Sequence, residues 1–217
     1  MLNFDTYTKD PDLVKKLLIG SLLALSGIGL IPLTGWLVAT LRKNIQEEAP
    51  FLPDWDDFGQ YVIDGLKGLG IGFIWALPVS VLVTAGAFGG VALATTVPDE
   101  DTATLVILIT NICIFAIMIP YTLILGALSG PALGRLAETG SFRDALSPSA
   151  AYRVLRANFG GFLIAYLISA IGQSVLGSIG ALLCLIGIYP ATVLAYGLMG
   201  QQFGQAYRQA KANLPAV

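Results

Sequence analysis

The stretch TATLVILITNICIFAIMIPYTLILGALSGPALG, residues 102–134, has 33 consecutive positions without Asp, Glu, Lys or Arg. A helix of about 20 apolar residues crosses the core of a bilayer, whereas the core of a small soluble domain does not need so long an uncharged run. We therefore expect a transmembrane helix in this stretch.

The composition of the whole chain indicates the same class of protein. Of the 217 residues, 55% are hydrophobic and 12% are charged, and the charged residues lie outside the long apolar runs. A charge at the centre of a bilayer costs about 3 kcal/mol or more, so a membrane imposes this segregation. The net charge is −2 and there is no basic tract, which argues against nucleic acid as a partner.

Further apolar runs complete the predicted architecture. Residues 68–98 form one uncharged run, and residues 157–207 are long enough for two spans joined by a turn within 172–180. The last span is expected from about 181 to 204, with a kink near Pro190. Together with residues 102–134, these runs predict an all-α, polytopic membrane protein with four transmembrane helices.

Residues 17–41 allow two interpretations. This run of 25 uncharged residues is long enough for one span, but Gly27, Gly35 and Pro32 interrupt it. It is either a kinked single span or a re-entrant hairpin whose arms, at about 12 residues each, are too short to cross. The hairpin would leave four flanking cations on one side of the membrane: Lys15, Lys16, Arg42 and Lys43.

The distribution of charge predicts the orientation in the membrane. Residues 98–101 contain three acids and no cation. The positive-inside rule therefore places this loop outside and puts both termini and the linkers 44–67 and 135–156 in the cytoplasm. No cleavable signal peptide is apparent, because residues 1–16 are polar. We expect the spans themselves to direct insertion.

Two amphipathic elbows are predicted at the membrane surface. The first is a helix over Asp54–Leu66, whose apolar side chains recur at helical spacing opposite its acids, Asp64 included. The second is Ser141–Leu146. Their interfacial anchors are Trp55, Phe58, Tyr61 and Phe142. The acids of the first elbow could instead form a cation site, but the glycine and bidentate glutamate of a calcium loop are missing, so we favour the surface helix.

Small residues are spaced for close helix packing near the ends of two spans. Gly126, Gly130 and Gly134 lie four residues apart on one helical stripe, and the gaps from Pro120 to the last two recur after Pro190. We predict helix packing, within the chain in preference to between copies, through Gly126, Gly130, Gly134, Gly197, Gly200 and Gly204. This recurrence of the same spacing predicts a single integral membrane domain with three weak elbow-plus-hairpin repeats, over 1–43, 44–135 and 136–211.

The chain offers few groups for catalysis. It has no histidine, and its predicted spans hold no carboxylate or lysine that could titrate at the midplane. Asn111 and Gln173 could line a polar pathway through the membrane, although a hydrogen bond between helices is the simpler role. Cys113 and Cys184 fit small packing positions. We expect no enzyme activity, no cofactor and no metal.

Several motifs resemble one known family. They are Lys15-Lys16-Leu-Leu-Ile-Gly20, the break at Gly27–Pro32, Leu52-Pro53-Asp54-Trp55-Asp56-Asp57-Phe58 and Asp64-Gly65-Leu66-Lys67. Together they look like domain of unknown function 4013, a family of uncharacterised prokaryotic membrane proteins. The resemblance covers most of the chain and is most specific between Leu52 and Lys67. It implies an all-helical fold in a bacterial or archaeal cell membrane, and it implies no reaction.

Two functions remain open on this evidence. The first is a structural, assembly or accessory subunit, which packs in the lipid bilayer against other membrane proteins or against itself as a homo-oligomer. The second is a passive transporter, channel or lipid-handling protein that uses the broken helices. Broken helices at transport sites usually accompany a charge that binds an ion or substrate, and none lies in these spans. We therefore favour the structural function.

Overall fold

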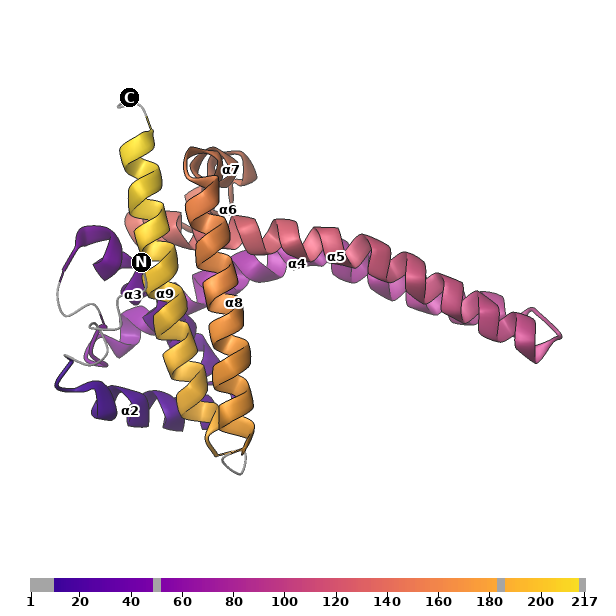
Figure 1. Ribbon diagram of the computed structural model, residues 1–217, viewed down its shortest axis with the longest axis horizontal. Helices are drawn as coiled ribbons and strands as arrows, with labels where there is room; N and C mark the ends of the chain where they lie inside the picture. Colours follow the sequence, from indigo (N-terminus) through magenta and orange to yellow (C-terminus); the bar gives the residue numbers. More distant parts are fainter. Residues whose placement is uncertain (1–9, 49–51, 183–185, 215–217) are drawn as a thin grey trace. The chain divides into compact units, whose positions relative to one another are not determined.

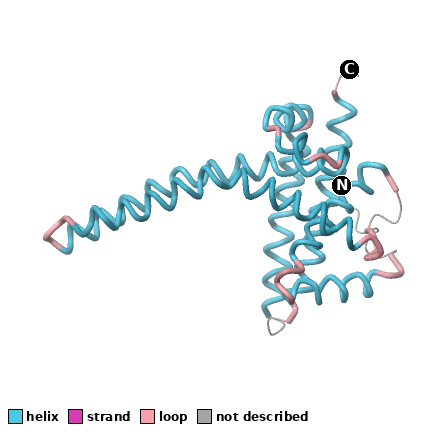
Figure 2. The backbone as a smooth tube through the Cα atoms, turned by 180° about the vertical axis from the view of Figure 1, so that it is seen from behind, coloured by secondary structure: helices cyan, strands magenta, loops and turns pink. Residues whose placement is uncertain are grey.

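The computed structural model describes residues 10–48, 52–182 and 186–214, and every regular element in them is a helix (Figures 1 and 2). The all-α prediction is confirmed for this part of the chain. The helices are α2 (Leu13–Leu25), α3 (Leu30–Gln46), α4 (Phe58–Thr95), α5 (Glu100–Thr139), α6 (Phe142–Leu146), α7 (Pro148–Ala157), α8 (Phe159–Leu182) and α9 (Ile188–Asn213).

The chain divides into two compact units. The hairpin unit comprises residues 72–126, and the bundle unit comprises the described parts of 1–71 and 127–217. The long helices α4 and α5 each contribute residues to both units. With 38 and 40 residues, each is also longer than the roughly 20 residues that a bilayer requires. Each unit is described by itself below.

In the hairpin unit, α4 and α5 pack against each other at small residues. A Cβ atom added at Gly86 would lie 3.2 Å from Ile114, and one at Gly90 would lie 2.6 Å from Thr110. The Tyr121 hydroxyl donates to the Trp75 carbonyl at 2.6 Å. Most other side chains of this unit are large, apolar and exposed, including Phe73, Val81, Phe88, Leu105 and Ile112. Helices that are apolar on all sides and unburied are typical of lipid-facing spans.

The turn between these two helices is polar, as the acids of residues 98–101 predict. Asp99 caps α5 by accepting hydrogen bonds from the backbone N–H of Thr102 at 2.9 Å and from its hydroxyl at 2.6 Å. These bonds favour the ionised carboxylate, the side-chain bond to Thr102 most of all, and lower the pKa of Asp99. This cap fixes the start of α5, the second helix of the hairpin unit.

The bundle unit is built around α9, which packs on α8, α3, α2 and α7. It runs antiparallel to α8, so that Gly172 meets Leu198 and the Asn158 side chain donates to the Ala206 carbonyl at 3.0 Å (Figure 1). It runs parallel to α3, because Gly200 lies against Thr40 and Gly204 lies against Asn44. Helix α9 is thus surrounded by other helices of the chain.

The ambiguous run 17–41 forms two separate helices, α2 and α3. Gly27 has a φ of +72° between them, a conformation that glycine adopts without strain. The Ser26 hydroxyl accepts from the Gly29 N–H at 3.0 Å and fixes the turn. Helix α2 then lies across the N-terminal part of α9, with Gly20 against Val193 (Figure 1). Helix α3 runs along α9, as the contacts of Gly200 and Gly204 show.

The start of α4 does not form the predicted first elbow. Helix α4 begins at Phe58 and continues without a break to Thr95, so Asp54–Leu66 is not a separate surface helix. The reason is close contact with α3: a Cβ atom at Gly35 would lie 1.7 Å from the Tyr61 carbonyl oxygen, and one at Gly65 would lie 1.9 Å from that of Ile31. Backbone contact of this kind holds the start of α4 inside the protein.

Candidate functional site

A buried carboxylate joins α3 to α4 in the bundle unit. Asp64 is completely buried and accepts a hydrogen bond from the Arg42 guanidinium at 2.9 Å and from the Gln60 amide at 3.0 Å. The ammonium group of Lys67 lies 3.9 Å away. A buried charge is tolerated only when it is paired and hydrogen-bonded, and Asp64 meets both conditions. The predicted solvent-facing position of Asp64 is therefore wrong.

The same cations extend this network to the C-terminal part of α5. Arg42 Nε donates to the Ala137 carbonyl at 2.9 Å, and Lys67 Nζ donates to the Gly140 carbonyl at 2.8 Å. Unpaired carbonyls at a helix C-terminus attract cations, so these bonds complement the end of α5. Three helices are thereby joined at one end of the bundle unit.

Beside this network lies a cavity of about 290 Å³, here called the basic cavity. It is lined by Arg42, Ile45, Gln46, Ala137, Glu138 and Lys211, which come from α3, α5 and α9. Glu138 pairs with Lys211 and accepts a hydrogen bond from the Tyr207 hydroxyl at 2.5 Å. Cationic and amide donors from separate helices converge here on a space open enough for a ligand.

A second buried charge lies at the other end of α9. Lys16 is 3% exposed and donates to Asp10 at 2.7 Å and to the Leu52 carbonyl at 2.9 Å, with Asp54 at 3.3 Å. The Trp55 indole donates to the Lys16 carbonyl at 3.0 Å. Lys16, one of the cations that flank residues 17–41, therefore lies inside the protein and joins the start of α2 to the segment before α4.

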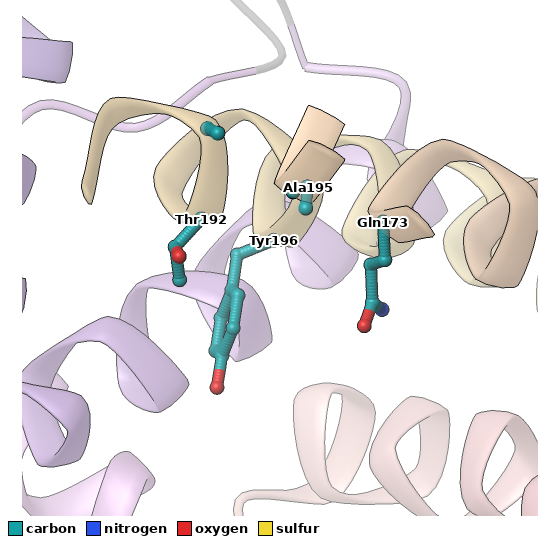
Figure 3. Close-up of a pocket in the computed structure, with 6 residues that line it drawn as sticks. Gln173, Thr192, Ala195 and Tyr196 are labelled. Atoms are coloured by element: carbon teal, nitrogen blue, oxygen red, sulfur yellow. The ribbon is translucent and has the colours of Figure 1, made fainter. Parts of the chain in front are cut away.

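A small polar pocket lies between α8 and α9 (Figure 3). Its volume is about 120 Å³, and it is lined by Gln173, Gly177, Ala191, Thr192, Ala195 and Tyr196. The side chains of Gln173, Thr192 and Tyr196 project to the same side of the helix pair (Figure 3). No charged residue lines this pocket, so its chemistry suits a small uncharged molecule that forms hydrogen bonds.

Two buried polar atoms on the same two helices have no hydrogen-bond partner among the described residues. They are Ser169 Oγ on α8 and Gln202 Nε2 on α9. An unsatisfied buried polar group costs about 1–3 kcal/mol, and water commonly satisfies such groups. The contact between α8 and α9 therefore has unmet hydrogen-bonding capacity in addition to the pocket.

The glycines predicted for helix packing lie mainly at close helix contacts. A Cβ atom at Gly130 would lie 2.7 Å from Phe203, one at Gly134 would lie 2.2 Å from Tyr207, and one at Gly200 would lie 2.8 Å from Thr40. Gly197 is buried in α9, and Gly126 is half-buried in the hairpin unit. The partners of the last two glycines of α9 come from α3, which spacing in the sequence does not reveal.

The predicted aromatic anchors have different environments. Tyr61 is 5% exposed and belongs to the core, and Trp55 stacks on Trp36 with ring centroids 5.7 Å apart, whereas Phe58 remains 44% exposed. Phe142 is half-buried beside Gly70. Of these four, Phe58 has the side chain freest to reach lipid. Tyr61 faces protein in this chain, because α3 covers the start of α4.

The remaining predicted polar and cysteine positions are separate from these sites. Asn111 is exposed on α5, and its amide donates to the Ile107 carbonyl of its own helix at 2.8 Å. Cys113 is exposed, and Cys184 lies outside the described residues. Within the described ranges no group of three or more His, Cys, Asp or Glu side chains could hold a metal ion.

Sequence reasoning missed the two buried charges, Asp64 and Lys16. A weak signal was present for Asp64, which precedes a glycine and lies three residues before Lys67, just ahead of an apolar run. Such an acid is as often solvated as buried, so only the contact between α3 and α4 identifies it. Lys16 carried no signal of burial, because besides the nearby Asp10 its partners are the distant Leu52 and Asp54.

Comparison with known families matches residues 18–185 to the family described as protein of unknown function (DUF4013). No curated protein and no solved structure matches the chain. The matched region contains the break at Gly27, the buried Asp64 and both helices of the hairpin unit.

Proposed function

We propose that this chain, which belongs to the DUF4013 family, is a multi-pass membrane protein with a structural role, an accessory subunit that packs against other membrane helices. Three helices in the described residues, α4, α5 and α8, are long and apolar enough to cross a membrane. We assign the protein no catalytic function and place it in a prokaryotic cell membrane, in line with the properties of the predicted family.

The observation that carries this proposal is the exposure of Asn111 in the hairpin unit. Only 6% of the most apolar part of α5 is buried within the chain, and Asn111 is exposed on this helix. An amide facing lipid retains hydrogen-bonding capacity that hydrocarbon cannot satisfy. Polar side chains in such positions commonly bond to a neighbouring helix. A helix of another protein, or of a second copy, would meet this need.

We further propose that α9 is the fourth span, as the apolar run 157–207 predicts. Its second half contains Gln201, Gln202 and Gln205, which makes it less apolar than the other three. Gln201 and Gln202 are buried against other helices of the chain, and Gln205 is half-buried. A polar helix can cross a membrane when other helices enclose it.

Charge in the bundle unit supports an orientation for its cation-rich end. Arg42 shares a cavity with Lys211 at the C-terminal end of α9, and Lys67 lies 3.9 Å from the carboxylate that pairs with Arg42. The positive-inside rule favours the cytoplasm for such a cluster of cations. We propose that this end of the bundle unit and the C-terminus are cytoplasmic and that the acidic turn at residues 98–101 lies outside.

Purification from native membranes tests the structural role. We expect a tagged chain to retain a stoichiometric membrane partner, or a second copy of itself, in mild detergent. Asn111→Leu should release the partner, because it removes the amide, whereas the neighbouring exposed substitution Ile112→Leu should not. Recovery of the wild-type chain as a monomer with lipid alone would contradict the proposal.

One observation favours a second function, the passive passage of a small polar solute. The pocket of about 120 Å³ between α8 and α9 is polar and uncharged, and Ser169 and Gln202 add buried groups without partners among the described residues. Solute uptake into proteoliposomes would test this function. Glycerol entry above that of empty vesicles, reduced by Gln173→Leu and unchanged by Ser80→Ala at an exposed hydroxyl, would favour passage over scaffolding.

A further inference from the structure

The basic cavity has the size and the position of a ligand site. Its volume of about 290 Å³ is many times the space that one water molecule needs. It lies where the C-terminal parts of α3, α5 and α9 meet, which is the cytoplasmic end in the proposed orientation. Lipid headgroups lie at the same depth as such helix ends.

Charge at this end of the bundle unit favours an anion. Four carboxylates, Glu47, Glu48, Asp64 and Glu138, are outnumbered by six cations, Arg42, Lys43, Lys67, Arg135, Arg208 and Lys211. Three helix C-termini add about half a negative charge each, which offsets part of this excess. Two of the cations, Arg42 and Lys211, line the cavity itself together with one carboxylate, Glu138.

The hydrogen-bond donors of the cavity are partly uncommitted. Arg42 has five N–H donors, and within the described residues two of them are engaged, by Ala137 and Asp64. These two bonds hold the guanidinium plane in place. The ammonium of Lys211 has three donors and gives one to Glu138. The amide of Gln46 is exposed at the rim.

From this geometry we infer that the basic cavity binds a phosphate group, presented either by an anionic lipid headgroup or by free phosphate. The planar guanidinium of Arg42 matches two phosphate oxygens, and Lys211 adds a second cation from another helix. Gln46 completes the donor set. Binding would join α3 to α9 at the end where Arg42 already joins α3 to α4 and α5.

Ligand-dependent stabilisation of the purified chain tests this inference. The probes are dioleoylphosphatidylglycerol, inorganic phosphate and, as the neutral lipid, dioleoylphosphatidylcholine, each titrated in detergent while the thermal midpoint is recorded. We expect saturable stabilisation by phosphatidylglycerol and none by phosphatidylcholine. Inorganic phosphate could instead stabilise the chain while phosphatidylglycerol does not bind. If the cavity variants described below weaken that effect, the site is supported and its ligand is free phosphate.

The variants distinguish binding in this cavity from non-specific attraction of anions to a basic surface. Lys211→Met should raise the half-saturating concentration by about tenfold, because it removes a charge-assisted hydrogen bond. Gln46→Leu leaves every ion pair intact, so it keeps the fold while weakening binding severalfold. Arg153→Gln, at an exposed cation of α7, should leave binding unchanged. Equal affinity in the wild type and both cavity variants, or failure of every probe to bind, would overturn the inference.

Discussion

Arg42 and Asp64 belong to different helices, and their side chains meet at 2.9 Å where the carboxylate has no contact with solvent. Removing one partner of a buried pair leaves the other charge uncompensated, at a cost of about 3–5 kcal/mol. We expect Arg42→Gln to lower the free energy of unfolding by about 3 kcal/mol, the low end of this range, because Lys67 and Gln60 remain near the carboxylate. Thermal and denaturant unfolding in detergent would measure the loss.

The pair of Arg208 with Glu47 provides a matched control. Its side chains are 40% and 66% exposed, so Arg208→Gln should cost no more than about 1 kcal/mol. Similar losses in both variants would mean that the Arg42–Asp64 pair contributes no more than a solvated one.

Gly134 leaves no room for a side chain. A Cβ atom there would lie 2.2 Å from the Tyr207 ring, so Gly134→Ala must displace a side chain that is hydrogen-bonded to Glu138. We expect a loss of about 1–3 kcal/mol from overpacking. Gly72→Ala, with nothing within 4 Å of the new atom, should instead stabilise its helix by up to about 1 kcal/mol. A melting temperature below that of the wild type for Gly134→Ala and above it for Gly72→Ala would confirm the contrast.

Trp55 and Phe58 are both predicted interfacial anchors, and the structure separates them. Trp55 stacks on Trp36 and donates to the Lys16 carbonyl, while Phe58 is 44% exposed. Trp55→Ala should therefore lower the free energy of unfolding by about 3 kcal/mol, and Phe58→Ala by less than about 1 kcal/mol. If Phe58→Ala is the more damaging change, contact with lipid or detergent outweighs the packing of Trp55.

Cysteine labelling tests the proposed orientation. After Cys113 and Cys184 are replaced by alanine, we expect Glu100→Cys to react with a membrane-impermeant maleimide applied to intact cells. Ala212→Cys should react only after permeabilisation, and labelling of Ala212→Cys in intact cells would contradict the orientation. Lys15→Cys separates the two interpretations of residues 17–41: labelling only after permeabilisation favours the re-entrant hairpin, and labelling in intact cells favours a kinked single span.

The acids of residues 54–57 are expected to bind no structural metal. Asp54 pairs with Lys16, whereas Asp56 and Asp57 are exposed. Replacing the last two by asparagine should change the free energy of unfolding by less than about 0.5 kcal/mol. A chelator should likewise leave the thermal midpoint unchanged. Destabilisation by the chelator that the double variant abolishes would indicate a cation site.

Local pattern was enough to predict the helices of the hairpin unit. The runs 68–98 and 102–134 are apolar on every side, and a helix with no polar face has no soluble alternative. The acids at 98–101 marked the turn, and the glycine break at 27 marked the end of α2. These features depend on residues close together in the chain.

The sequence by itself thus determined an all-helical fold, its family and three helices long and apolar enough to cross a membrane. Only the tertiary structure decided that Asp64 and Lys16 are buried and that α3 runs parallel to α9. It also brought Arg42 and Lys211 to one cavity. The reason is physical: helical periodicity shows which residues share a face, but burial depends on what covers that face. Here the covering groups come from segments that lie 22 to 169 positions away, a separation that local spacing does not encode.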